Sequence, residues 1–297
     1  MCQAYRHNRK VAENMDTQKK YQPQYSFEFY PPKTQAGAEK LVLAREKLAT
    51  LNPRYFSVTF GAGGSTQTGT LETIFDIQQS GYDACPHLSC IGSTRENIEH
   101  LLQTYQSNDI KRIVALRGDM PSGMHEVGAF RHANELVAFI REQTGDHFHI
   151  EVAAYPEFHP QAISSRADLD NFKLKIEAGA SSAITQYFFN PDAYYRFIED
   201  CEKMNVTVPI VPGIMPITNY KQLARFSDMC GAEIPRWIRK RLESYGDDLD
   251  SIRAFGTDVI SDMCKHLLAA GAPGLHFYTM NQSRATMAIW NNLGISN

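Results

Sequence analysis

The sequence has no excess of charge of one sign, no long apolar run and no closely spaced pair of cysteines. Its formal net charge is −3 over 297 residues, which provides no basic field for binding nucleic acid. No apolar stretch approaches the roughly 18 residues that cross a bilayer. The six cysteines form no Cys-x-x-Cys pair and no secretory signal is recognisable, which favours a reduced, cytoplasmic protein. We therefore expect neither a membrane nor a nucleic-acid partner.

Common phosphate and metal motifs are absent as well. The turn Gly61–Thr66 lacks the Gly-Lys-Ser/Thr ending of a P-loop and does not match G-x-G-x-x-G, so a tight turn is the default interpretation. Cys85, His87 and Cys90 could suggest zinc. Residues 85 and 87 would share one face of a strand while residue 90 takes the other, so we predict no metal site.

Eight short apolar runs recur along the chain, each with the length, the β-branched and aromatic content and the Gly/Pro flanks of a buried strand. Helical periodicity fills the intervals. A strand–helix unit repeated eight times predicts an α/β fold, the (β/α)₈ TIM barrel, with its active site at the C-terminal strand ends. The predicted strands are Tyr25–Pro31, Tyr55–Ala62, Ala84–Ile91, Arg112–Asp119, His149–Pro156, Ser182–Phe189, Pro209–Pro216 and Gly274–Met280.

Helices are predicted between these strands, and an extra one is expected before strand eight because that interval is about two units long. Ile234–Tyr245 is the candidate for the extra helix, followed by a long helix over Leu249–Ala270. Thr94 and Ser165 resemble helix caps. The other predicted helices are Ala36–Leu48, Gln67–Ser80, Thr94–Gln106, Asn134–Gln143, Asp168–Ala178, Ala193–Met204 and Tyr220–Met229.

The chain divides unevenly. Residues 1–22 are polar and lack strong periodicity, so we expect a mobile arm or a helix that caps the bottom of the barrel. Residues 23–297 are predicted to form a single catalytic barrel, because the strand spacing is regular throughout.

Several strand ends carry polar residues that a core would not contain. Glu28 lies between two phenylalanines, and burying an unpaired carboxylate costs several kcal/mol. It could form a structural ion pair with a barrel Arg or Lys. It could also be functional, since an aromatic surround favours the protonated carboxyl, which could donate a proton near neutral pH. The functional interpretation gains support from Asp119, Gln186 and His87, which are expected to converge on the same rim.

One predicted helix carries a polar stripe. Asp168, Asn171 and Lys175 recur at i, i+3 and i+7 and so share a helix face. Such a stripe is usually a solvated face. Because it begins just after strand five, it could instead contact a ribityl or phosphate group.

Eight motifs, taken in order, resemble the methylenetetrahydrofolate reductase family: SFEFYPP, VTFGAGG, PHLSC, ALRGD, AAYPEFHP, AITQYFF, PGIMPITNY and HFYTMNQ. The similarity covers nearly all of residues 25–295 and indicates the short bacterial type, a catalytic barrel alone. The resemblance implies noncovalent FAD that is reduced by NADH or NADPH and then reduces 5,10-methylenetetrahydrofolate in a ping-pong scheme. The product, 5-methyltetrahydrofolate, supplies methyl groups for methionine synthesis. Relatives also suggest a homo-oligomer.

The resemblance implies roles for individual residues. Glu28 matches the general acid, and Asp119 matches a carboxylate that orients folate and tunes the flavin potential. Gln186 would bind the folate, Tyr220 would lie in a loop that covers both substrates, and Gln282 would meet the folate tail. The positions that match FAD contacts are Thr59, His87, Leu116, Arg117, Gly118, Asp119, Ala133, Ala153, Tyr155, His159, Asp168, Asn171 and Lys175.

Two positions depart from the family pattern. Leu174 stands where a close relative has a flavin-contacting Arg, which weakens the expectation for phosphate contacts. Gln282 stands where some members have Arg, and Arg284 lies two residues on. The choice between NADH and NADPH stays open, because there is no dinucleotide fold to interpret.

Three alternative functions fit the sequence less well. A flavin barrel of the proline dehydrogenase type would also bind FAD, but it does not explain Glu28, Asp119 and Gln186 together. A Schiff-base aldolase needs a lysine on a strand, and the nearest one, Lys111, lies at the wrong end. An inactive flavin-binding partner subunit is a third alternative, which the retained acidic residues argue against.

Overall fold

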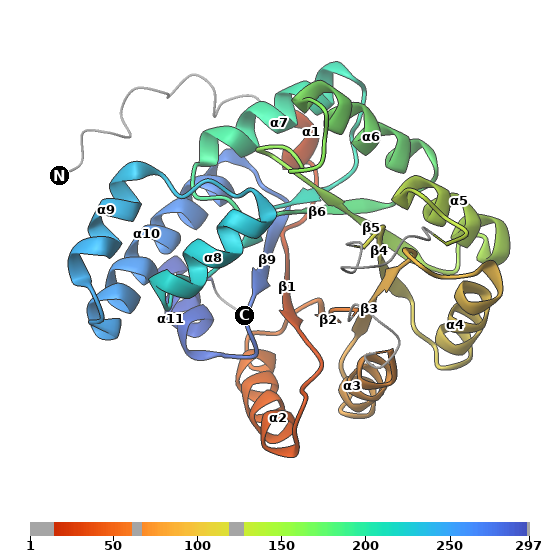
Figure 1. The fold of residues 1–297 in the computed structure, drawn as a ribbon, viewed down its shortest axis with the longest axis horizontal. Helices are drawn as coiled ribbons and strands as arrows, with labels where there is room; N and C mark the ends of the chain where they lie inside the picture. The colour runs from red at the N-terminus through yellow and green to blue at the C-terminus, as the bar shows by residue number, and fades with distance from the viewer. Residues whose placement is uncertain (1–14, 61–66, 119–127, 296–297) are drawn as a thin grey trace.

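Parallel strands form the centre of the molecule and helices surround them (Figure 1). The computed structural model describes residues 15–60, 67–118 and 128–295. The strands are β1 (Gln24–Phe29), β2 (Tyr55–Val58), β3 (Ala84–Ser89), β4 (Arg112–Leu116), β5 (His149–Ala154), β6 (Ser182–Thr185), β7 (Ile210–Val211), β8 (Gly213–Ile214) and β9 (Gly274–Tyr278).

The strand order shows how the barrel closes. All pairs are parallel, in the order β7-β6-β5-β4-β3-β2-β1-β9-β8. Only Pro212, which has no N–H to donate, separates β7 from β8, so the two are halves of one interrupted strand. The Pro212 carbonyl still accepts a hydrogen bond from the His276 amide at 2.9 Å. The predicted (β/α)₈ barrel is confirmed.

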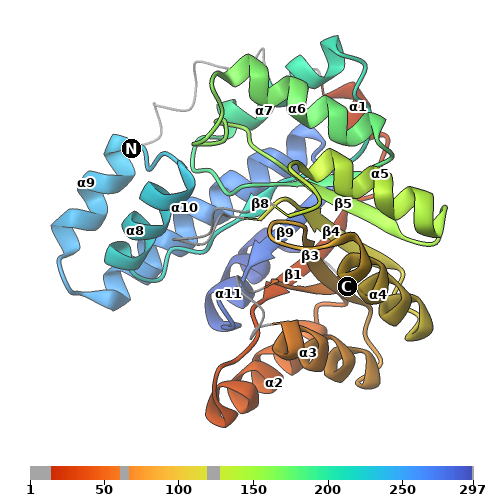
Figure 2. The ribbon, with the colours of Figure 1, turned by 45° about the vertical axis from the view of Figure 1, so that its right-hand side comes forward.

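The helices follow the strands in alternation. Three of them, α8, α9 and α10, lie between β8 and β9 and gather on one side of the barrel in both views (Figures 1 and 2). The helices are α1 (Asp16–Lys19), α2 (Gln35–Ala49), α3 (Gln67–Gln79), α4 (Arg95–Ser107), α5 (Ala133–Thr144), α6 (Ser165–Glu177), α7 (Pro191–Lys203), α8 (Tyr220–Cys230), α9 (Arg236–Tyr245), α10 (Leu249–Ala270) and α11 (Arg284–Leu293). Helix α11 was not predicted from the sequence.

Two apolar clusters lie on opposite faces of the sheet. The large one packs strands against helices and includes Phe27, Phe56 and Trp290. The small one fills the barrel interior with Tyr55, Cys85, Val114 and Ile184, next to Leu116. Alternation along each strand produces this division, since successive side chains point to opposite faces.

Helix α1 lies beside the N-terminal end of β7. The buried Gln18 side chain donates to the Val208 carbonyl at 3.1 Å and accepts from the Ile210 amide at 2.9 Å. Thr17 hydrogen-bonds to Glu202 on α7 through both its amide and its hydroxyl. The start of the described chain is thus attached to a strand about 190 residues away.

One predicted cap is wrong by a residue. The N-cap of α6 is Ser164, whose Oγ accepts from the Ala167 amide at 3.1 Å, rather than Ser165. Thr94 caps α4 as predicted and accepts from the Asn97 amide. Both cap residues have extended backbone, and the side-chain oxygen satisfies an amide that has no partner within the helix.

None of the helices in the described ranges is long and apolar enough to span a membrane.

Candidate active site

Glu28 is the second-to-last residue of β1 and its carboxyl group points into the barrel. Its Oε2 atom lies 3.3 Å from His87 Nε2 on β3 and 3.4 Å from His276 Nε2 on β9. His276 is fully buried, and its Nδ1 atom lies 2.7 Å from the Ser26 hydroxyl. The partners of Glu28 in the barrel are therefore two imidazoles, and no Arg or Lys among the described residues forms the predicted ion pair with it.

The two phenylalanines beside Glu28 in the sequence do not surround its carboxyl group. Phe27 packs on Phe56, Phe277 and Trp290 on the outer face of the sheet. Phe29 stacks on Phe56 on that same face. The expected aromatic surround is wrong, because neighbours along a strand point to opposite faces of the sheet.

The loop after β9 fixes the backbone around Glu28. Thr279 Oγ1 donates to the Glu28 carbonyl at 2.6 Å. The Asn281 side chain accepts from the Tyr30 amide and donates to the Tyr30 carbonyl, both at 2.9 Å. Met280 and Asn281 adopt left-handed φ values of 53° and 55°, a local strain that these bonds help to maintain.

A second polar group lies deeper in the barrel. Tyr55 donates to Glu151 Oε2 at 2.7 Å, and Arg112 pairs with the other oxygen of that carboxylate. His149 Nε2 lies 2.7 Å from the Ser182 hydroxyl. Burial, with help from nearby arginines, lowers the pKa of His149 to about 4. The polar side chains of this group are paired with one another, and they lie toward the N-terminal end of the strands, away from the rim.

A cavity of about 340 Å³ opens at the C-terminal rim of the barrel. Gln186, the residue directly after β6, lines it together with Tyr155 and His159. Four apolar side chains form much of the rest of the wall: Met215, Phe226, Met229 and Met280. The structure thus brings three of the predicted site residues into one cavity of mixed polarity, as ligand sites commonly are.

Tyr220 does not line this cavity. It is the first residue of α8, and its hydroxyl donates to Glu243 on α9 at 3.3 Å. Phe226, almost two turns further along α8, supplies the aromatic wall instead. Phe226 was not predicted from the sequence, although the i, i+3 and i+7 pattern of Leu223, Phe226 and Cys230 on a helix beside the rim could have indicated it.

Many of the predicted cofactor residues form one connected group beside the rim cavity. Arg117 follows β4 and donates to the Gly118 carbonyl and to Gln161 Oε1. The backbone amide of Gln161 in turn donates to His159 Nδ1 at 3.0 Å. The His159 amide donates to Asp168 Oδ2 at 2.8 Å, which links this loop to the first turn of α6.

Lys175 extends the same group along α6. Its ammonium donates to the Ala153 carbonyl at 2.6 Å, and burial lowers its pKa to about 8 despite the opposing effect of Asp168. The Tyr155 and His159 rings meet edge to face at 4.7 Å. This connected group thus contains two cations, Arg117 bound to Gln161 and Lys175 bound to the Ala153 carbonyl, and such cations can offset the charge of a diphosphate.

The remaining predicted cofactor residues lie around this group. Gly118 has φ +86° and leaves no room for a side chain, because a Cβ would lie 1.9 Å from Ser89 Oγ. Asn171 is exposed on α6. Leu174, which stands where a close relative has an arginine, is 47% exposed. Thr59 follows β2, Leu116 ends β4 and Ala133 begins α5. Asp119 lies outside the described residues.

Comparison with known proteins identifies the family. The family model for methylenetetrahydrofolate reductase matches residues 11–294. The chain belongs to this family. Its 5,10-methylenetetrahydrofolate reductase relative in Salmonella typhimurium is 40% identical over 271 residues, which are 91% of this chain and 90% of the relative. That in Escherichia coli is 39% identical with the same coverage. The predicted enzyme class, an oxidoreductase, is confirmed.

Plant members of the family are longer. "Methylenetetrahydrofolate reductase (NADH) 1" of Arabidopsis thaliana is 39% identical over 288 residues, 92% of this chain. The chain spans about half the length of that relative, 49% of it.

Solved structures with low sequence identity share the reductase family's barrel fold. A Clostridium thermocellum protein, described as binding two copies of 5-methyl-5,6,7,8-tetrahydrofolic acid, has a TM-score of 0.63 at 16% identity and covers 94% of this chain and 96% of its own. A phosphonopyruvate hydrolase has a TM-score of 0.53 at 12% identity and covers 95% and 84%. These similarities show the fold alone.

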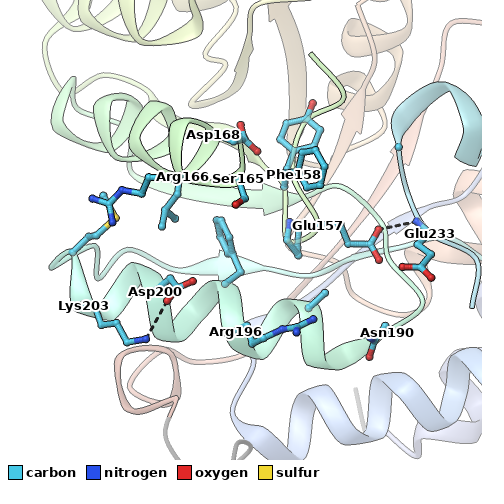
Figure 3. Close-up of a pocket in the computed structure, with 17 residues that line it drawn as sticks. Glu157, Phe158, Ser165, Arg166, Asp168, Asn190, Arg196, Asp200, Lys203 and Glu233 are labelled. Carbon is cyan, nitrogen blue, oxygen red and sulfur yellow. Dashed lines mark hydrogen bonds and ion pairs between the residues drawn. The ribbon is translucent and has the colours of Figure 1, made fainter. Parts of the chain in front are cut away.

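A second, larger cavity lies beside the rim cavity and shares Tyr155 with it. It measures about 610 Å³ and lies between α6 and α7 (Figure 3). Arg166 and Lys203 lie at one end, and Asn190 and Glu233 at the other. Lys203 is paired with Asp200, and Glu157 accepts from the Glu233 amide at 2.8 Å. Its charges are of both signs and largely satisfied, so we assign the site to the smaller rim cavity.

Proposed function

We propose that this protein reduces 5,10-methylenetetrahydrofolate to 5-methyltetrahydrofolate. Noncovalent FAD would be the redox cofactor, with NADH or NADPH as the hydride donor and the folate as the acceptor, in a ping-pong cycle that would supply methyl groups for methionine synthesis. Membership of the family and 90% coverage of the bacterial relatives support this activity. The observation that carries it is the Glu28 carboxyl group, which lies inside the barrel near the C-terminal end of β1, beside two imidazoles.

FAD fits the residues beside the rim. Arg117 and Lys175 can offset a diphosphate, Asp168 can accept from hydroxyl groups, and the Tyr155–His159 pair offers an aromatic edge. Bound there, FAD supplies the hydride chemistry, whereas the protein positions the reactants and tunes charge. The other residues assigned to the cofactor are Thr59, His87, Leu116, Gly118, Asp119, Ala133, Ala153 and Asn171.

The protein's own groups handle the folate. Glu28 holds a proton and donates it as the methylene bridge opens, which makes the bridging carbon a better hydride acceptor. The Gln186 amide hydrogen-bonds the folate, and Asp119 orients it. We assign the aromatic contact to Phe226, whose ring lines the cavity, in addition to the role expected of Tyr220. Gln282 is exposed after β9, where it can meet the folate tail.

The visible spectrum of the purified protein tests this proposal. We expect the absorption bands of oxidised flavin, bleached by NADH or NADPH under anaerobic conditions and restored by methylenetetrahydrofolate. Proline in place of the folate serves as the control for the proline dehydrogenase alternative. A colourless protein that binds no added FAD would contradict the proposal, as would a flavin that proline reduces and the folate does not reoxidise.

A further inference from the structure

The two oxygens of the Glu28 carboxyl group have different surroundings. Both imidazole contacts are made to Oε2, at 3.3 Å from His87 Nε2 and 3.4 Å from His276 Nε2. Within the described part of the chain, no hydrogen bond or ion pair ends on Oε1. The barrel therefore holds one oxygen of the carboxyl group and leaves the other without a partner in the described ranges.

The state of the two histidines follows from this geometry and from the proposed function. Burial lowers the pKa of His87, although Glu28 opposes the shift, so the His87 ring is neutral near pH 7. An acid that serves the substrate must carry its proton on the oxygen that faces the substrate. Oε2 is then an acceptor, and His276 Nε2, which hydrogen-bonds to it, must carry hydrogen. His87 Nε2 lies close to Oε2 but forms no hydrogen bond.

Ser26 makes this arrangement possible for His276. When Nε2 of a neutral imidazole carries the hydrogen, Nδ1 has only a lone pair and needs a donor. The Ser26 hydroxyl, which is 2.7 Å away and also buried, can serve as that donor. Without the Ser26 hydroxyl, the unprotonated Nδ1 of His276 would be buried with no hydrogen-bond partner, which costs about 1–3 kcal/mol of stability.

We propose that Ser26 and His276 are positioning residues for Glu28: Ser26 donates to His276 Nδ1, His276 Nε2–H donates to Glu28 Oε2, and Oε1 is thereby reserved for the catalytic proton. This inference rests on the proposed function, because it assumes that Glu28 acts as the acid. It assigns a function to a buried serine–histidine pair at the opposite side of the carboxyl group from the rim. The groups that face Glu28 in the described ranges are His87 and Cys85 from β3 and His276 and Tyr278 from β9.

Nitrogen NMR of the FAD-bound protein with ¹⁵N-labelled histidine tests the tautomer directly. We expect the His276 signals to show a protonated Nε2 and an unprotonated Nδ1 in the wild-type chain. In Ser26→Ala the population should move toward the Nδ1-protonated form. A wild-type His276 with hydrogen on Nδ1 would overturn the proposal, and this measurement needs no catalytic turnover.

Kinetics of the two half-reactions test the positioning role. His276→Phe keeps a ring but has no donor, so oxidation of the reduced flavin by methylenetetrahydrofolate should slow by about 100-fold. Ser26→Ala should slow it by about 10-fold, the equivalent of one hydrogen bond. His276→Gln retains an N–H donor and should recover most of the rate. Flavin reduction by NADH should be unchanged in all three variants.

His149 provides the matched control. It forms the same kind of serine–histidine pair inside the barrel, 2.7 Å from Ser182, but makes no contact with Glu28. His149→Phe should leave both half-reactions as they are near pH 7. Equal slowing by His149→Phe and His276→Phe would show a general loss of barrel packing and overturn the proposal. If Glu28→Gln leaves the rate of the folate half-reaction unchanged, the proposed acid role of Glu28 is wrong. If Glu28→Gln slows that half-reaction but the His276 variants do not, the acid role stands and the positioning role of His276 is wrong.

Discussion

Exchange of the Glu28 carboxyl group for an amide removes one proton donor and leaves the side-chain size unchanged. In Glu28→Gln, we expect flavin reduction by NADH to keep its rate. Reoxidation by methylenetetrahydrofolate should fall by about 10²–10⁴-fold, because general acid catalysis contributes that much. Stopped-flow absorbance measures the two half-reactions separately.

Glu157→Gln is a suitable control for that variant. Glu157 is also a partly buried carboxyl group, and burial raises its pKa, but it bonds to the Glu233 amide outside the barrel interior. Its amide variant should leave both half-reactions near wild type. Equal losses in both half-reactions of Glu28→Gln would rule out the acid role.

At the residue scale, the sequence identified Glu28 but not its environment. The local string SFEFYPP suggested an aromatic surround, whereas the register brings in His87 and His276 from other strands. His276 is 248 residues away along the chain, so no local pattern could reveal the contact. Phe226 was missed for a related reason: a motif showed which helix approaches the rim but not which face of the helix turns inward.

At the scale of elements, only one of the two adjacent serines at the start of α6, Ser164, is its N-cap. Ser164→Ala should lower the free energy of unfolding by about 1 kcal/mol, because the Ala167 amide loses its acceptor. Ser165→Ala should change it by less than about 0.5 kcal/mol. Urea unfolding followed by circular dichroism measures both. A larger loss for Ser165→Ala would mean that the cap lies one residue later than the hydrogen bonds indicate.

Two elements escaped prediction for physical reasons. Helix α11 has no side-chain N-cap bond, so the usual start signal is missing. The interruption at Pro212 divides strand seven, yet each half pairs with a different neighbour and the barrel still closes. Both features involve distant parts of the chain: Trp290 of α11 packs on Phe27 of β1, and β8 pairs with β9.

At the scale of the whole molecule, Gln18 joins the start of the described chain to strand seven. Gln18→Ala leaves the buried Ile210 amide and the Val208 carbonyl without partners. We expect a loss of about 2–3 kcal/mol in unfolding free energy. Gln22→Ala, at an exposed position four residues later, serves as the control. Equal stability of the two variants would contradict a structural role for Gln18.

The barrel interior also predicts acid sensitivity. The folded His149 binds a proton only near pH 4, while the unfolded chain binds one near the ordinary pKa of 6.5. Between these values the unfolded state takes up more protons, so the contribution of His149 to stability is present above pH 6.5 and lost as the pH falls toward 4. That loss amounts to about 3 kcal/mol.

Urea unfolding at pH 7 and pH 4.5 measures this effect. His149→Gln should lose less stability than the wild type over this interval, because its amide does not titrate. His100→Gln, at an exposed position on α4, should behave like the wild type. Identical pH dependence in the wild type and His149→Gln would refute the prediction.

The sequence by itself determined the eight strands, most of the helices and the family, because strand length, alternation and caps are local properties that short windows carry. The tertiary structure alone decided which polar groups meet: the two imidazoles on one oxygen of Glu28, the clamp of Asn281 on Tyr30, and Phe226 at the rim. Those contacts join residues up to about 250 positions apart. They arise only when the closed ring of strands fixes the register between β1 and β9.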